Sequence, residues 1–169
     1  RRRHQKHRLK RPRREREGEL LQVDASIHAW LKFAGDERLY ALIGAIDDAT
    51  GRVWARFELA ETTEGYFRVM EAVLRQGVPL ELYSDRDSVF TINNANDRYG
   101  LHQRGRPLET QFGRAMRELD VRIILAHSPQ AKGRIERLWK TCQDRLLNEL
   151  KLEGIKTLQE ANRYLHRVF

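Results

Sequence analysis

The amino-acid sequence predicts an α/β domain in which helices cover a five-stranded mixed sheet. Two observations lead to this prediction. The first part of the chain shows three strand patterns in succession, and from residue 63 onward helical and strand patterns alternate. A meander followed by such an alternation is typical of a mixed sheet flanked by helices.

Three strands open the predicted domain. The short apolar run at 20–24, LLQVD, ends in an acid, and the run at 39–46, LYALIGAI, precedes the turn signal DDATGR. Residues 53–59, VWARFEL, alternate between apolar and polar side chains, as a half-buried strand does. Their order predicts three consecutive antiparallel strands.

The hydrophobic period then changes to that of a helix. In residues 63–76, Phe67, Met70 and Leu74 recur at helical spacing, and Gly77 ends the segment. The pattern predicts the first helix of the alternating part.

Two more strands and three more helices complete the prediction. Strands are expected at 79–85 and 121–128, and a long helix from 133 to about 154. A last helix begins at Thr157, where the Thr-x-x-Glu spacing to Glu160 indicates a capping box. The helix between the last two strands shows the apolar stripe Phe112, Ala115, Met116 and Leu119.

The chain's excess positive charge lies in its first residues. The chain has 32 basic and 24 acidic residues. Residues 1–17 contain ten of the basic and two of the acidic ones, which leaves 22 of each sign in the rest of the chain. Residues 1–18 are therefore predicted to be a basic arm that neutralises nucleic-acid phosphates, with a solvated linker as the alternative. The nucleic-acid contacts expected from it are Arg1, Arg2, Arg3, Lys10 and Arg11.

The core domain is predicted to span residues 19–169. The chain starts without Met and stops within a helical pattern, so we expect a fragment of a longer protein with an N-terminal DNA-binding domain outside it. The single cysteine, Cys142, excludes an internal disulfide and suits a reducing compartment. Scattered histidines argue against structural zinc, and the sequence shows neither a membrane-spanning apolar run nor a signal peptide.

Three acids stand at positions where catalytic ligands gather. Asp24 closes the first predicted strand, Asp85 closes the fourth, and Glu136 opens the long helix. Strand ends and helix starts converge at the sites of mixed sheets. Carboxylates without Cys or clustered His suit Mg²⁺ or Mn²⁺. A single Asp at a strand end is more often a turn or cap residue, so position alone leaves both interpretations open.

The segments around these acids resemble a known family. LQVDAS, LYSDRDSVF and AHSPQAKGRIERLWKT are similar to the three catalytic motifs of the retroviral-integrase and transposase superfamily, and most similar to those of bacterial insertion-sequence transposases. The resemblance covers roughly residues 19–165. It implies a ribonuclease-H-like fold, with Asp24, Asp85 and Glu136 as catalytic metal ligands.

The resemblance also implies a reaction. Two Mg²⁺ or Mn²⁺ ions in the DNA-bound state would support hydrolysis of a phosphodiester at the element's end and strand transfer into target DNA. It further implies DNA as partner, a homodimer or higher multimer, no membrane, and a bacterial cytoplasmic location with nucleoid association. The alternatives are a nuclease of the same fold that joins no strands, and a non-catalytic DNA-binding or assembly module.

One segment departs from the family pattern. Fifty residues separate Asp85 from Glu136, more than in the retroviral members. The polar stretch 91–107 accounts for the difference and is predicted to be a loop insertion between intact motifs.

Further DNA contacts are expected around Glu136. Lys132 and Lys140 flank it at four residues to either side, a spacing that places side chains together on a helix. Gln130 lies in the loop that resembles the family's DNA-contacting segment, and Arg134 adds a cation there. A row of surface ion pairs is the alternative explanation for the charges.

Four further polar residues near the motifs complete the candidates. Asp87 lies two residues after Asp85 and would replace it if the strand ended later. His28 is a possible site neighbour. Asp47 and Asp48 are predicted to form the hairpin turn.

Overall fold

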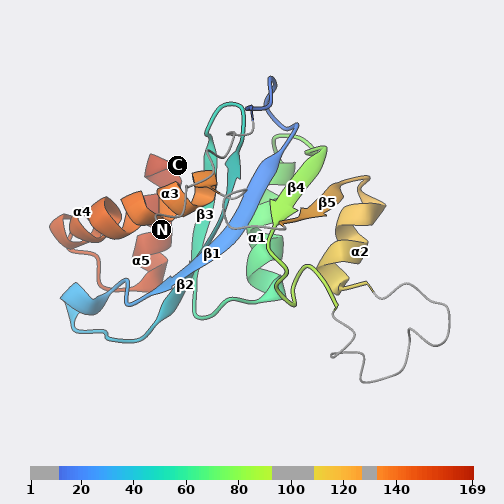
Figure 1. The fold of residues 1–169 in the computed structure, drawn as a ribbon. Helices are drawn as coiled ribbons and strands as arrows, with labels where there is room; N and C mark the ends of the chain where they lie inside the picture. The colour runs from blue at the N-terminus through green and yellow to red at the C-terminus, as the bar shows by residue number, and fades with distance from the viewer. Residues whose placement is uncertain (1–11, 93–108, 127–132) are drawn as a thin grey trace, which may run out of the picture.

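The computed structural model describes residues 12–92, 109–126 and 133–169. Within these ranges five strands form one sheet in the order β3-β2-β1-β4-β5 (Figure 1). The first three strands pair antiparallel, and β4 and β5 continue the sheet parallel to β1. The predicted mixed sheet is confirmed. The strands are β1 Leu21–His28, β2 Tyr40–Asp47, β3 Val53–Glu58, β4 Glu81–Ser84 and β5 Arg122–Leu125.

Helices cover both faces of this sheet (Figure 1). Helices α1 and α2 pack on one face, and α3, α4 and α5 on the other. A π-helical turn joins α3 to α4 without a break, so the predicted long helix is one continuous element. The helical elements are a short 3₁₀ helix Lys32–Ala34, α1 Thr63–Leu74, α2 Gln111–Glu118, α3 Gly133–Thr141, the π-helical turn Cys142–Leu146, α4 Leu147–Leu152 and α5 Leu158–Val168.

Strand β2, which lies next to the central strand β1, separates two apolar cores. All eight of its residues are buried, and they alternate between the two faces. The core under α1 and α2 is built around Tyr66, Phe90 and Phe112, whose rings pack edge to face. The core under α3 to α5 contains Trp30 and Trp139. Burial on both faces explains why β2 has a continuous apolar sequence.

Threonine side chains cap the starts of α1 and α5. The hydroxyl of Thr157 accepts the backbone N–H of Glu160, and the carboxylate of Glu160 accepts the backbone N–H of Thr157. The predicted capping box is therefore confirmed. Thr62 caps α1 by accepting the N–H of Gly65 in the same way.

The first strand is longer than predicted. It continues four residues beyond Asp24, because Ala25–His28 pair with the first residues of β2. The predicted loop 91–107 lies outside the described residues except for 91 and 92. No helix in the described ranges is long and apolar enough to cross a membrane.

Candidate active site

Asp24 lies on β1, and Asp85 directly follows the adjacent parallel strand β4. β1 pairs with β4 so that Gln22 lies opposite Tyr83. Continuing that register by two residues sets Asp24 level with Asp85. Neighbouring strands lie about 4.8 Å apart, and residues that are level in a parallel pair point to the same face. This register brings two acids that are 61 residues apart in the sequence to the same face of the sheet.

That face of β1 is joined to the long helix by a polar ladder. Every second residue of the strand bonds every fourth residue of the helix. The two spacings match, because two strand residues advance about 6.6 Å and four helix residues about 6 Å. Strand and helix therefore run side by side over three contacts. These contacts, the β1–α3 ladder, are Ile135 N to Gln22 Oε1 at 3.3 Å, Trp139 Nε1 to Asp24 Oδ2 at 3.1 Å and Gln143 Nε2 to Ser26 Oγ at 3.1 Å.

Glu136 lies at the start of this ladder. It is exposed on the first turn of α3, one residue after Ile135 and three before Trp139. Residues three apart share one side of a helix, so Glu136 lies on the side of α3 that faces β1. In the described ranges, no group of three or more His, Cys, Asp or Glu side chains is close enough to hold a metal ion. The predicted ligands therefore lie in one region of the fold, but their carboxylates are not close enough together to form a metal site.

The turn after β4 distinguishes Asp85 from Asp87. The strand ends at Ser84, so Asp85 follows it directly, as predicted. Asp85 Oδ1 accepts the backbone N–H of Asp87 at 3.2 Å, and Asp87 Oδ1 accepts the N–H of Val89 at 3.0 Å. Both carboxylates thus accept a backbone N–H two residues further along the turn. The end of β4 at Ser84 is what favours Asp85 over Asp87, because Asp85 directly follows the strand.

A fourth carboxylate, Glu61, lies near the two aspartates and was missed from the sequence. Burial raises the pKa of Glu61, and the negative charges of Asp87, Asp24 and Asp85 raise it further. A hydrogen bond from the Tyr66 hydroxyl to Glu61 Oε1, at 2.6 Å, acts in the opposite direction. Glu61 stands in the connection between β3 and α1, with no strand end or family motif to mark it.

The two aspartates of the β2–β3 turn differ in role. Asp47 Oδ1 accepts the N–H groups of Ala49 at 3.0 Å and Thr50 at 2.7 Å, which confirms it as a turn former. Asp48 is 2% exposed, and its carboxylate accepts the backbone N–H of Arg14 and the side-chain amide of Gln22. Asp48 therefore ties the residues before β1 to the strand itself.

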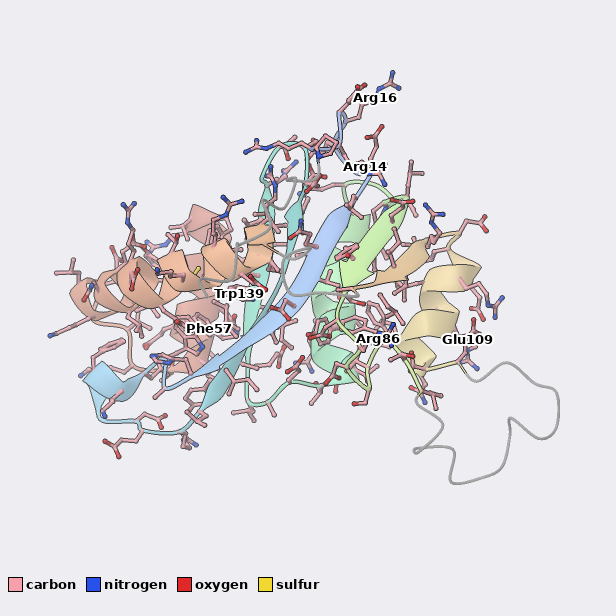
Figure 2. The ribbon with its side chains drawn as sticks, in the orientation of Figure 1. Arg14, Arg16, Phe57, Arg86, Glu109 and Trp139 are labelled. Atoms are coloured by element: carbon pink, nitrogen blue, oxygen red, sulfur yellow. The ribbon has the colours of Figure 1, made fainter. Side chains whose placement is uncertain are left out.

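Arg14 adds a second anchor at the same end of the sheet. Its guanidinium bonds Glu81 Oε2 at 2.6 Å, at the start of β4 (Figure 2). The part of the predicted basic arm that the structure describes is thus fixed against the core. The predicted DNA contacts Arg1, Arg2, Arg3, Lys10 and Arg11 lie outside the described residues.

The predicted DNA contacts near Glu136 divide into two groups. Lys140 is exposed one turn after Glu136, where a phosphate can reach it. The Nε atom of Arg134 lies 3.4 Å from Asp48 Oδ1, and the side chain of Arg134 is 13% exposed. Little of that side chain's surface is open to the DNA contact predicted from the sequence. Lys132 and Gln130 lie outside the described residues.

His28 is placed away from the acids. It is the last residue of β1, four residues beyond Asp24, which corresponds to roughly 13 Å along a strand. Its ring packs edge-on against Trp30, with centroids 5.4 Å apart. The structure therefore gives His28 a packing contact at the far end of the strand.

The chain is similar in sequence to known transposases. No protein-family model matches the chain. Over 157 residues, 92% of the chain, it is 43% identical to a putative transposase of Sinorhizobium fredii and 41% identical to the transposase for insertion sequence IS1202 of Streptococcus pneumoniae. The chain spans about a third of the length of these relatives, 33% and 32% respectively.

The chain is similar in fold to a solved integrase structure. The integrase catalytic core domain of HTLV-2, determined in complex with magnesium in a dimeric form, superposes with a TM-score of 0.61 at 17% sequence identity. The match covers 88% of this chain and 83% of that one. At this identity the likeness concerns the fold, which is the ribonuclease-H-like fold expected from the motifs. Sequence and fold together place the chain in the integrase and transposase superfamily, as a core domain of that family.

Proposed function

We propose that this chain is the catalytic core of a DNA transposase, which hydrolyses a phosphodiester at an element's end and transfers the freed strand into target DNA. The observation that carries the proposal is that Asp85 directly follows β4, level with Asp24 of the parallel strand β1 when their register is continued, beside the helix that bears Glu136. Identity of 43% to a putative transposase supports the same activity.

The residues fit a divalent cation by their chemistry. Asp24, Asp85 and Glu136 offer carboxylate oxygens alone, the ligands that Mg²⁺ and Mn²⁺ prefer. Glu136 is exposed and has three rotatable side-chain bonds, so its carboxylate can swing toward the aspartates. When bound with DNA, two such ions would supply Lewis-acid stabilisation of the attacking and leaving oxygens.

The remaining work of the protein is to position DNA. Lys140 would hold a phosphate beside Glu136, and Lys132, Gln130 and the basic arm would extend that contact along the strand. Fixing the phosphodiester against the acids favours in-line attack, with no covalent protein intermediate. Because two element ends must be joined in one event, a homodimer or higher multimer is part of the proposal.

Metal-dependent stabilisation tests the proposed ligands. Mg²⁺ should raise the melting temperature of the wild-type chain, because a ligand that binds only the folded state stabilises it by mass action. Asp24→Asn and Asp85→Asn should each remove that rise, whereas Asp144→Asn, at an exposed acid of the π-helical turn, should keep it. Equal stabilisation of all four chains would show that the aspartates hold no metal.

Two further assays separate the alternatives. Incubating a labelled element end with target DNA should give joined product, whereas a nuclease of the same fold would give hydrolysis alone. Loss of DNA binding on removal of residues 1–17, with no metal-dependent cleavage by the intact protein, would favour a non-catalytic binding module.

A further inference from the structure

The three tryptophans of the chain differ in what their indole N–H groups meet. Trp139 Nε1 donates to the carboxylate of Asp24 at 3.1 Å, between residues 115 positions apart. Trp30 Nε1 donates to the backbone oxygen of Ser26 at 3.2 Å. Trp54 Nε1 is buried and has no hydrogen-bond partner among the described residues. Of the three, Trp139 alone therefore bonds a proposed metal ligand.

The indole of Trp139 is held in place from two sides. It is 6% exposed and lies between α3 and the sheet (Figure 2). Beneath it is Gly44, which pairs directly with Asp24 across β1 and β2. A Cβ atom at Gly44 would lie only 2.7 Å from Trp139 Cη2, so the absence of a side chain there creates the space that the ring occupies. The ring is thus seated against one strand while it bonds the acid of the next.

We propose that Trp139 is a positioning residue for the catalytic acids. Its N–H fixes one oxygen of Asp24, so that the carboxylate keeps one orientation. Because Trp139 lies one turn after Glu136, the same bond fixes the rotation of α3 that turns Glu136 toward β1. A hydrogen bond to a carboxylate is stronger than one between neutral groups, so it holds this orientation firmly. Trp139 acts through Asp24 and does not itself touch DNA or metal.

This role rests on the proposed function of Asp24, and the three indoles provide its test. In ¹H–¹⁵N correlation spectra the indole N–H groups give separate peaks, which Trp30→Phe and Trp54→Phe assign by elimination. Addition of Mg²⁺ should move the Trp139 peak and leave the Trp30 and Trp54 peaks in place. Asp24→Asn, in Mg²⁺-free buffer, should also move the Trp139 peak, because a neutral amide then replaces the carboxylate.

Substitution of the ring then measures the effect on binding. Trp139→Phe keeps an aromatic ring but loses the N–H, and should weaken Mg²⁺ binding about tenfold by calorimetry, the value of one charge-assisted hydrogen bond. Trp30→Phe is the matched control, since it removes an indole bond in the same apolar core but from a backbone oxygen. It should leave the Mg²⁺ affinity unchanged.

The outcomes separate this inference from the proposed function. If the wild type binds Mg²⁺ without a shift of its Trp139 peak, and Trp139→Phe binds Mg²⁺ equally tightly, the positioning role is overturned and the ligands stand. If the wild type binds no Mg²⁺ even with DNA present, the proposed function fails and the positioning role falls with it. Should Trp139→Phe fold poorly, the response of the Trp139 peak in the wild type decides the matter alone.

Discussion

The side-chain amide of Gln22 accepts a hydrogen bond from the backbone N–H of Ile135 at 3.3 Å, and it donates to Asp48 Oδ1 at 3.2 Å. Gln22 is 2% exposed and stands two residues before Asp24. The first N–H groups of a helix have no partner within the helix. The strand that carries Asp24 therefore supplies a partner to the first turn of α3, which carries Glu136.

Replacement of this amide should cost stability. Gln22→Leu leaves the buried N–H of Ile135 without its acceptor, and we expect the free energy of unfolding to fall by about 1–3 kcal/mol. Urea denaturation followed by circular dichroism measures the change. Gln76→Leu, at an exposed position after α1, should change it by less than about 0.5 kcal/mol. Similar results for both variants would mean that the Gln22 bond contributes no net stability.

Gly44→Ala tests the space under Trp139. The added methyl group would lie 2.7 Å from Trp139 Cη2 and 2.9 Å from the backbone oxygen of Trp54. Backbone atoms on a paired strand cannot easily move aside, so we expect a loss of about 1–3 kcal/mol in unfolding free energy. Gly113→Ala in α2, where the nearest atom is the Thr110 hydroxyl at 3.2 Å, should cost less. An unchanged stability for Gly44→Ala would show that the ring shifts without penalty.

The local pattern of the sequence was enough to predict most of the fold. Periodicity placed all five strands, and turn and cap residues such as Thr157 marked the helix ends. Alternation in the chain order also predicted the mixed sheet. These features depend on neighbouring residues, which is why they can be predicted from short windows.

Contacts between distant segments were not predictable in this way. Nothing local to Gln22 indicates that its partner is Ile135, 113 residues away. Glu61 was missed because its position near Asp24 and Asp85 depends on the path of the connection between β3 and α1. Arg134 was assigned to DNA because its sequence neighbourhood is basic, whereas packing brings it against Asp48, far from it in sequence.

Asn162 provides a prediction at the open edge of the sheet. From α5 its side-chain amide accepts the backbone N–H of Phe57 at 2.8 Å and donates to the Phe57 oxygen at 3.0 Å, as a further strand would. Asn162→Ala should lower the unfolding free energy by about 1–3 kcal/mol, because both backbone groups lose a partner. Asn148→Ala, where an exposed amide bonds its own helix, is the control in the same urea titration. Equal losses would argue against the edge contact.

Glu61→Gln should stabilise the metal-free fold at neutral pH. Burial, and then the charges of Asp87, Asp24 and Asp85, raise the pKa of Glu61 above that of the unfolded chain. A raised carboxyl pKa means that ionisation costs stability as pH rises through the unfolded and then the folded pKa. Below the ordinary Glu pKa of about 4.3 both states are protonated and the cost is absent. The neutral amide avoids this cost, and its oxygen can still accept the Tyr66 hydroxyl.

The gain from Glu61→Gln should therefore be present at pH 7 and shrink toward zero as pH falls through 4, measured by urea denaturation across that range. The same change removes a negative charge near Asp24 and Asp85, so Mg²⁺ binding should weaken while stability without metal rises. Glu71→Gln, at an exposed acid of α1, should show neither effect. A Glu61→Gln chain that is less stable at pH 7 would instead show that the charged hydrogen bond to Tyr66 outweighs burial and repulsion. Opposite changes in stability and metal affinity are expected only of an acid that repels the proposed ligands in the absence of the cation.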